Sequence, residues 1–223
     1  LPADALHCLR IDDDQRLLMS DLEEKLRADL AAGYKPVAIV GSAGTVSTGA
    51  VDPLRSMAYL CAHHKVWLHI DGAYGGFAAM LDDASEDLKA LALADSVAID
   101  PHKWLYAPLE AGCALIRDEA KHRAAYSYHP PYYHFGEAAT NYVDFGPQNS
   151  RGFRALKVWM ALRQVGRSGY QQMIGEDIAL AEALYHRLRK DARFEVYTVN
   201  LSITTFRYVP QELRATLGQP ETE

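Results

Sequence analysis

The sequence has few cysteines, no long apolar run and no excess of basic residues. Its three cysteines, Cys8, Cys61 and Cys113, are an odd and scattered set. Such a set argues against a disulfide framework or a metal site and favours reduced cytoplasmic thiols. No apolar run is long enough to span a membrane, and no signal-peptide pattern opens the sequence. With a formal net charge of −6 and no basic cluster, neither nucleic acid nor a membrane is an expected partner.

Internal repeats and low-complexity linkers are absent as well. The nine histidines include the pair His63-His64, but no Cys or carboxylate spacing around the pair indicates zinc. We interpret the pair as a solvated helix end and expect no metal. Of the 223 residues, 49% are hydrophobic and 23% are charged. That composition is enough for one large packed domain or for one and a half smaller ones.

Short apolar runs alternate with helical patterns along the first half of the chain. We expect strands at residues 5–11, 37–40, 66–70, 96–99 and 114–116. We expect helices from Ser20, the N-cap of a capping box with Glu23, to about residue 32, and at residues 53–64 and 84–94. The continuous apolar runs are typical of strands buried on both faces. The alternation predicts an α/β fold whose mainly parallel sheet is covered on both sides.

Beyond residue 117 the pattern changes. Residues 126–149 hold five Tyr and three Pro with little periodicity, which is typical of a long functional loop. Helices are expected at 151–165 and 169–190, and strands of a smaller unit at 194–199 and 201–208. The first of these helices has an apolar face formed by Phe153, Leu156, Trp159, Met160 and Leu162. A domain boundary is expected between residues 166 and 175. A two-strand unit does not fold alone, so we expect the chain to be incomplete.

Two strings of residues carry the chemistry. Asp71 follows the run at 66–70, and Lys103 lies in Asp100-Pro101-His102-Lys103-Trp104, after the run at 96–99. In open parallel sheets, ligands bind beyond the carboxyl ends of the strands. A lysine and an aspartate on neighbouring strand ends can hold a pyridoxal phosphate ring. The lysine amine forms a Schiff base, and the carboxylate faces the pyridine nitrogen.

Each residue also has a simpler interpretation. Asp71 could only cap the following turn, although the glycines around it favour the close approach of a flat ligand. Most lysines are solvated, but apolar residues flank Lys103 in the sequence, and an enclosed lysine becomes nucleophilic. His102 could contact a phosphate, stack on a ring, or simply pack. The small residues from 41 to 49 could let a cofactor lie against the backbone, or could be a tight polar loop.

Residues 36–117 and 151–159 resemble the pyridoxal-phosphate-dependent amino acid decarboxylases of the aromatic-amino-acid and glutamate decarboxylase group. The resemblance is carried by His69-Ile70-Asp71-Gly72-Ala73-Tyr74-Gly75-Gly76, by Asp100-Pro101-His102-Lys103-Trp104 and by Phe153-Arg154-Ala155-Leu156-Lys157. It implies PLP fold type I, an aspartate-aminotransferase-like α/β fold. It also implies a homodimer with active sites at the subunit interface. Residues 1–166 would be part of the large cofactor-binding domain, including the mobile loop at about 126–149. Residues 167–223 would be a connecting helix and part of a small C-terminal α+β domain.

The same resemblance implies a role for each matched residue. Lys103 would be the Schiff-base lysine, and Asp71 would be the partner of the ring nitrogen. Ala73 would pack against the ring, and Thr45 would lie near the ring's oxygen substituent. His102 would lie beside the cofactor, and Asp100 would lie near its phosphate. In the loop, Tyr132 matches the family's catalytic tyrosine, and a one-residue slip would give the role to Tyr133.

Three departures from the family pattern stand out. Position 100 is Asp where many relatives have Asn, and a second carboxylate near a phosphate needs a compensating donor. Gly152 replaces a basic residue that is common before the Phe-Arg-Ala-Leu-Lys string. The family's ring-stacking histidine and its main phosphate-binding loop lie upstream of the matched region.

The resemblance implies decarboxylation of an L-amino acid to its amine and CO2. Two alternatives within the cofactor class are an amine-oxidising aldehyde synthase and an aminotransferase. A third alternative is a non-catalytic fragment or a subunit that needs a complementary chain. The sequence does not identify the amino acid that is the substrate.

Overall fold

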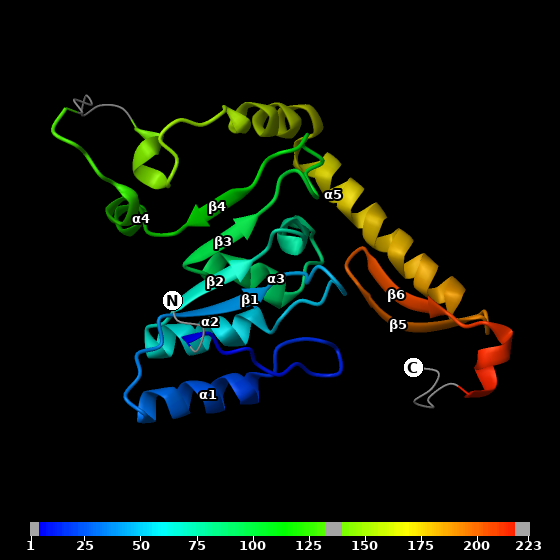
Figure 1. Ribbon diagram of the computed structural model, residues 1–223. Coiled ribbons are helices and arrows are strands. Elements are labelled where there is room, and N and C mark those ends of the chain that lie inside the picture. Colours follow the sequence, from blue (N-terminus) through cyan, green and yellow to red (C-terminus); the bar gives the residue numbers. More distant parts are fainter. Residues whose placement is uncertain (1–4, 133–139, 217–223) are drawn as a thin grey trace.

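In the computed structural model, residues 5–132 and 140–216 are described, and they form a four-stranded sheet, a long helix and a separate hairpin (Figure 1). The sheet has the order β1 (Ala38–Ser42), β2 (Trp67–Asp71), β3 (Ser96–Ile99), β4 (Cys113–Ile116). The first three strands are parallel, and β4 runs antiparallel to β3. The expected mainly parallel sheet is confirmed, with a short antiparallel strand at its edge.

Helices precede and connect the parallel strands. The helix α1 (Met19–Ala31) precedes β1, and α2 (Leu54–His64) connects β1 to β2. Between β2 and β3 lies α3 (Glu86–Lys89), which continues into the 3-10 turn η3 (Ala90–Leu93). The expected helices at 53–64 and 84–94 are thus confirmed, the second as two short pieces. Ser85 caps α3, because its hydroxyl accepts a hydrogen bond from Leu88 N at 3.2 Å. His63 and His64 are exposed at the end of α2, as expected of a solvated helix terminus.

Two expectations for the first thirty residues are wrong. Residues 6–10 form no strand, and Ile11 makes only one isolated bridge, to Leu17. The backbone of this segment instead binds the start of α1, because Arg10 N donates to Asp21 Oδ2 at 2.8 Å. Ser20 is not the N-cap either: α1 begins at Met19, and Leu18 precedes it without a side-chain cap. The Asp21 side chain thus accepts a hydrogen bond from the backbone N–H of Arg10, whereas in a capping box a side chain of the first turn accepts one from the N–H of the N-cap residue.

The core lies between one face of the sheet and the helices. Leu68 and Ile70 of β2 are fully enclosed there by Leu54 and Met57 of α2, with Leu22 and Leu26 of α1 adjoining the same cluster. Because strand side chains alternate between faces, the neighbouring residues point to the opposite side. On that side Val40 of β1 is exposed. The expectation of burial on both faces is therefore wrong for the run at 37–40. In β3, by contrast, the neighbouring residues Ser96 and Val97 are both buried.

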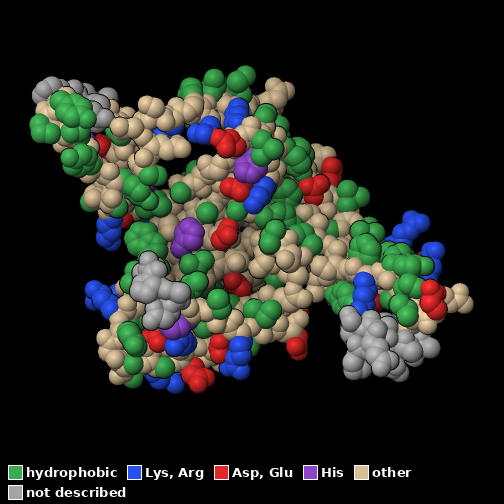
Figure 2. Space-filling view, viewed as in Figure 1, with side chains coloured by type: hydrophobic (Ala, Val, Ile, Leu, Met, Phe, Trp, Pro, Cys, Tyr) green, Lys and Arg blue, Asp and Glu red, His purple; other side chains and the backbone are tan. Residues whose placement is uncertain are grey.

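The chain then leaves the sheet through α4 (Glu119–Tyr126) and η4 (Tyr142–Phe145) and enters α5 (Arg154–Leu188). Gly166 has φ 71° and ψ 171°, which breaks α5 into the two helices that the sequence predicts. The first half leaves its apolar face exposed, and Figure 2 shows hydrophobic side chains along the upper edge of the molecule, where this half runs in Figure 1. The second half buries Tyr170, Ile174 and Ala181.

The C-terminal strands form the expected hairpin, β5 (Phe194–Asn200) with β6 (Ile203–Tyr208), followed by the 3-10 turn η5 (Gln211–Thr216). The hairpin lies along the second half of α5 (Figure 1), where Thr204 Oγ1 donates to Ala181 O at 2.7 Å. Its tip reaches the loops that follow β1 and β2. There Asn200 Nδ2 donates to Thr48 O at 3.2 Å, and Ser202 bonds to Tyr74. Division of the chain at residue 166 stays a prediction.

Candidate active site

The three parallel strands end side by side, as the sequence predicts. Ser42, the last residue of β1, pairs with Asp71, the last residue of β2, and Asp71 pairs with Ala98 of β3. The loops beyond these strand ends are also bonded to one another. Gly72 N donates to Ala98 O at 2.9 Å, and Asp100 N donates to Ala73 O at 3.2 Å. The two chemistry-bearing strings therefore share one edge of the sheet, which is where open parallel sheets bind ligands.

Asp71 is an exposed carboxylate at this edge. Its Oδ1 accepts a hydrogen bond from Ala73 N at 3.0 Å, so the side chain does cap the turn that follows β2. Within the described residues, Oδ2 accepts no hydrogen bond. One oxygen thus orients the carboxylate and leaves the other available for a ligand. The capping role and the proposed ring contact are compatible.

Lys103 lies in the turn that follows β3, with its side chain 42% exposed. The expectation of an enclosed lysine is wrong: the buried residues of this turn are Pro101, Trp104 and Leu105, while the lysine itself reaches solvent. Its Nζ lies 3.0 Å from Asp100 Oδ2, an i,i+3 ion pair. The exposed amine is accessible to an aldehyde, and Asp100 holds it at a defined place.

His102 stands beside this ion pair. Its Nδ1 lies 2.7 Å from Ala111 O and its Nε2 lies 3.8 Å from Asp100 Oδ2. The N–H of Ala111 also donates to Nδ1 at 3.2 Å, so the backbone of Ala111 holds this side of the ring. The other ring nitrogen, Nε2, faces Asp100. This is a packed histidine, so contact with a ligand through Nε2 stays a prediction.

The backbone of Ala73 connects the two strings, whereas the Thr45 side chain bonds within its own loop. Ala73 bridges the two strings through its backbone, since its N–H binds Asp71 and its carbonyl binds Asp100. Thr45 is engaged in its own loop: its Oγ1 accepts from Ala50 N at 3.2 Å and lies 2.9 Å from Thr48 Oγ1. The Thr45 hydroxyl therefore stabilises the loop after β1, and its proposed place near the cofactor stays a prediction.

Tyr132 is 74% exposed, in the last turn before the undescribed residues 133–139. The alternative, Tyr133, lies outside the described residues. The segment leading to Tyr132 is held at its base by Asp144, which is only 2% exposed. His129 Nε2 lies 2.7 Å from Asp144 Oδ1, and Arg123 lies 3.2 Å from Oδ2. Sequence reasoning missed Asp144, because nothing in its spacing distinguishes a buried carboxylate from a solvated one.

Two further residues were missed, Tyr74 and Asp177. Tyr74 stacks on Trp104, with ring centroids 4.7 Å apart, and so joins the two strings. Asp177 Oδ2 accepts a hydrogen bond from Trp104 Nε1 at 2.9 Å. A signal for Asp177 was present in the sequence: it lies three residues after Ile174 and four before Ala181, on the buried stripe of α5. A carboxylate on such a stripe requires donors, because an unpaired buried charge is costly.

Comparison with known proteins identifies the family. Residues 4–209 match the family described as "Pyridoxal-dependent decarboxylase conserved domain". The chain belongs to the pyridoxal-dependent decarboxylases. Within this family it is 38% identical to an aromatic-L-amino-acid decarboxylase from Bacillus atrophaeus over 93% of this chain and 44% of the relative. It is 32% identical to an aspartate 1-decarboxylase from Aliivibrio fischeri over 96% of this chain and 39% of the relative. The chain thus spans less than half the length of these relatives.

Solved structures of pyridoxal-dependent decarboxylases have the same fold. Mouse CSAD superposes with a TM-score of 0.89 at 28% identity, covering 98% of this chain and 46% of that one. Oryza sativa TDC, whose structure was solved with PLP and tryptamine, gives a TM-score of 0.82 at 32% identity, covering 88% and 41%. These matches confirm the expected fold type I. None of the helices in the described part of this chain combines the length and the hydrophobicity that a membrane crossing requires.

The residues at the strand ends fit the cofactor of this family. An aldehyde requires an accessible primary amine, which Lys103 provides. A pyridine nitrogen requires a carboxylate, and Asp71 has an oxygen that the described residues leave unbonded. Ala73, whose backbone bonds to both Asp71 and Asp100, adds only a methyl group beside them. An amine and a carboxylate are the groups that the aldehyde and the ring nitrogen of pyridoxal phosphate require.

Proposed function

We propose that this protein decarboxylates an L-amino acid to its amine and CO2, with pyridoxal phosphate held by Lys103 and Asp71. The observation that carries the proposal is the placement of these two residues on neighbouring strand ends whose loops are bonded to each other. Two relatives with different substrates by name, an aromatic amino acid and aspartate, share the decarboxylation that their names state. The proposal is therefore for the shared reaction.

The cofactor supplies, when bound, an aldehyde that condenses with amines and a ring that accepts the electron pair released as the Cα–carboxylate bond breaks. Lys103 binds the aldehyde carbon through Nζ, and only a neutral amine can attack it. The ion pair with Asp100 at 3.0 Å must therefore open, and the proton must leave Nζ first. Asp100 is the nearest carboxylate that can take it, and His102 Nε2 lies 3.8 Å further along.

The other two residues act on protons at defined atoms. Asp71 keeps a proton on the pyridine nitrogen, because its carboxylate favours the cationic ring, which withdraws electrons more strongly. Tyr132 delivers a proton from its hydroxyl to Cα after CO2 has left. Tyr132 is exposed, so the proposal requires the segment that carries it to fold over the strand ends, and such closure would exclude water from the reacting carbon.

A homodimer is part of the proposal. The first half of α5 exposes Phe153, Trp159 and Met160 together, and a contiguous apolar surface of this kind marks a protein interface. We expect Trp159→Glu to shift the sedimentation of the protein from dimer to monomer. As a control, Arg163→Glu changes charge on the same helix without removing an apolar side chain. A Trp159→Glu protein that sediments as the unaltered one does would remove this face from the interface.

The first experiment is reduction of the purified protein with borohydride in the presence of pyridoxal phosphate, with mapping of the modified lysine by mass spectrometry. A pyridoxyl adduct on Lys103, together with CO2 release from an amino acid, is the expected result. Asp71→Asn removes the charge of Asp71 and should lower kcat by about 10²–10³-fold, because a ring nitrogen without that charge beside it is less readily protonated and the ring then withdraws electrons less strongly. Asp83→Asn, at an exposed carboxylate in the loop after β2, is the matched control. Equal rates for both variants would contradict the role of Asp71.

A further inference from the structure

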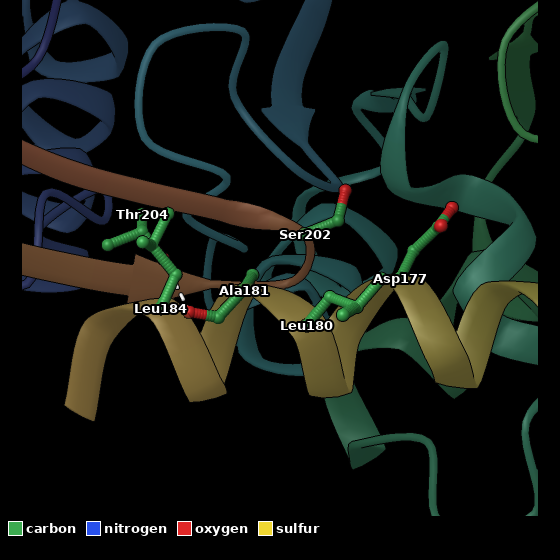
Figure 3. A pocket seen from close by; sticks show the side chains of 6 residues that line it. All are labelled: Asp177, Leu180, Ala181, Leu184, Ser202 and Thr204. Atoms are coloured by element: carbon green, nitrogen blue, oxygen red, sulfur yellow. Dashed lines mark hydrogen bonds between the residues drawn. The ribbon is translucent and has the colours of Figure 1, made fainter. Parts of the chain in front are cut away.

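The three residues that follow Lys103 are all held from the second half of α5. Trp104 Nε1 donates to Asp177 Oδ2 at 2.9 Å, and the Tyr106 hydroxyl donates to the same oxygen. Between them, Leu105 O accepts from the Tyr170 hydroxyl at 3.0 Å. Figure 3 shows Asp177 projecting from the helix at one end of a pocket of about 340 Å³, which is lined by Leu180, Ala181, Leu184, Ser202 and Thr204.

The turn that carries Lys103 depends on this support. Lys103 N donates to Asp100 O at 2.9 Å, and Lys103 O accepts from Tyr106 N at 3.0 Å, so Tyr106 closes the turn around the lysine. Tyr106 has φ 51°, a left-handed conformation that bulky residues rarely adopt. Such a conformation persists only where its surroundings impose it. The hydroxyl bond to Asp177 is the contact that holds the Tyr106 side chain, and with it the closing residue of the turn.

Trp104 connects the same carboxylate to the other half of the site. Its side chain is 4% exposed, and its ring packs on Tyr74 with an interplanar angle of 31°. Tyr74 lies three residues after Asp71, and its hydroxyl is 2.6 Å from Ser202 Oγ at the tip of the hairpin. Movement of Trp104 would therefore disturb both the lysine turn and the turn after Asp71.

The chemistry of the contact requires a carboxylate. Two donors converge on one oxygen of Asp177, and burial, with the hydrogen bond to Asp177, raises the pKa of the Tyr106 hydroxyl, which stays a donor. A carboxylate oxygen can accept both bonds, and its charge strengthens each of them. An asparagine amide in the same place would face the two donors either with its uncharged oxygen, which accepts each bond more weakly, or with its NH2 group, which accepts neither.

We propose that Asp177 is the positioning residue for Lys103, acting through Trp104 and Tyr106. The proposal rests on the role of Lys103 proposed above. It assigns to α5 a part in cofactor attachment, because the amine can reach the aldehyde in the correct orientation only while the turn is held. Small displacements of a reacting group have large effects on rate.

The test compares Asp177→Asn and Tyr106→Phe with Glu176→Gln, which removes the same charge from the adjacent, exposed position of α5. The rate of Schiff-base formation is followed by visible absorbance after pyridoxal phosphate is mixed with the cofactor-free protein, and the adduct is trapped with borohydride and mapped. We expect Asp177→Asn to form the Lys103 adduct about tenfold to hundredfold more slowly, with Tyr106→Phe between it and the control. Thermal unfolding of Tyr106→Phe should match that of the control within a few degrees, which separates positioning from loss of structure.

The outcomes separate this proposal from the proposed function. If the unaltered protein forms the Lys103 adduct and all three variants form it at the same rate, the role of Asp177 is refuted and the role of Lys103 is not. No adduct on Lys103 of the unaltered protein would overturn the role of Lys103 and the positioning with it. If Asp177→Asn does not fold, Tyr106→Phe decides, because it keeps the Trp104 bond and the carboxylate and removes only the hydroxyl through which Asp177 holds the closing residue of the turn.

Discussion

Gly75 is the position where a single methyl group should damage both the fold and the site. It is buried just after β2, and its N–H donates to Ala43 O in the loop after β1 at 3.0 Å. A Cβ on Gly75 would collide with that same oxygen and would lie 2.6 Å from Leu201 Cδ1 at the hairpin tip. Because Ala43 contributes a backbone atom, the conflict is relieved only if the two strand-end loops move apart.

The magnitude follows from three terms. Losing the Gly75–Ala43 bond costs about 0.5–1.5 kcal/mol, and overpacking costs about 1–3 kcal/mol. The stiffer unfolded chain of an alanine variant returns about 0.4–1 kcal/mol. We therefore expect Gly75→Ala to lower the free energy of unfolding by about 0.5–4 kcal/mol.

The control for this experiment is another glycine-to-alanine change. Gly175 lies inside α5 with nothing within 4 Å of the position of its Cβ. Alanine is favoured over glycine within a helix, so Gly175→Ala should raise the free energy of unfolding by about 0.5–1 kcal/mol. Urea unfolding monitored by tryptophan fluorescence measures both variants, and borohydride trapping measures the Lys103 adduct. If Gly75→Ala were as stable as the unaltered protein and formed the adduct as fast, the packing of the loops on each other would not support the site.

Three other predictions concern the loop and the thiols. Tyr132→Phe should slow amine formation by about 10²–10⁴-fold and raise the ratio of peroxide to amine, which a coupled peroxidase assay measures; an unchanged ratio would exclude Tyr132 as the proton donor. The hydrogen bond from His129 lowers the pKa of Asp144 below its ordinary 3.8, so its stabilising effect is complete above that pH and is lost as the pH falls further. Asp144→Asn should therefore be less stable than the unaltered protein at neutral pH, with a difference that shrinks below pH 3.8 in urea titrations; a constant difference would contradict the linkage. Burial raises the pKa of the Cys61 thiol to about 11, so iodoacetamide at neutral pH should alkylate the exposed Cys8 in the folded protein and reach Cys61 only on unfolding, as peptide mapping would show.

Much of the fold could be read from local patterns. The strand at 96–99 was placed to the residue, and the one predicted at 66–70 differs by one residue from β2 (Trp67–Asp71). Such strands are short, continuous apolar runs bounded by polar turn residues, and that signal is contained within a few positions. The break in α5 at Gly166 is predictable for the same reason, because glycine is common where the backbone has a positive φ, which other residues adopt with difficulty.

Two of the errors concern contacts that a local pattern does not record. Residues 6–10 have an apolar pattern that suits a strand, yet their backbone binds the start of α1 through Asp21. The run at 37–40 was expected to be buried on both faces, but Val40 is exposed in the described structure. An apolar pattern records what a residue prefers, and it does not record whether a partner is present to bury it.

Local sequence is enough to predict which chemical groups stand at the ends of the strands, including Asp71 and Lys103, because each of them closely follows a short apolar run. The contacts that hold those groups in place join distant segments and form only in the folded protein. Trp104 and Asp177 are 73 residues apart, and Tyr74 and Ser202 are 128 apart. Hydrogen bonds across such separations leave no periodic trace in the sequence. They arise only when the hairpin and α5 have packed against the loops of the sheet.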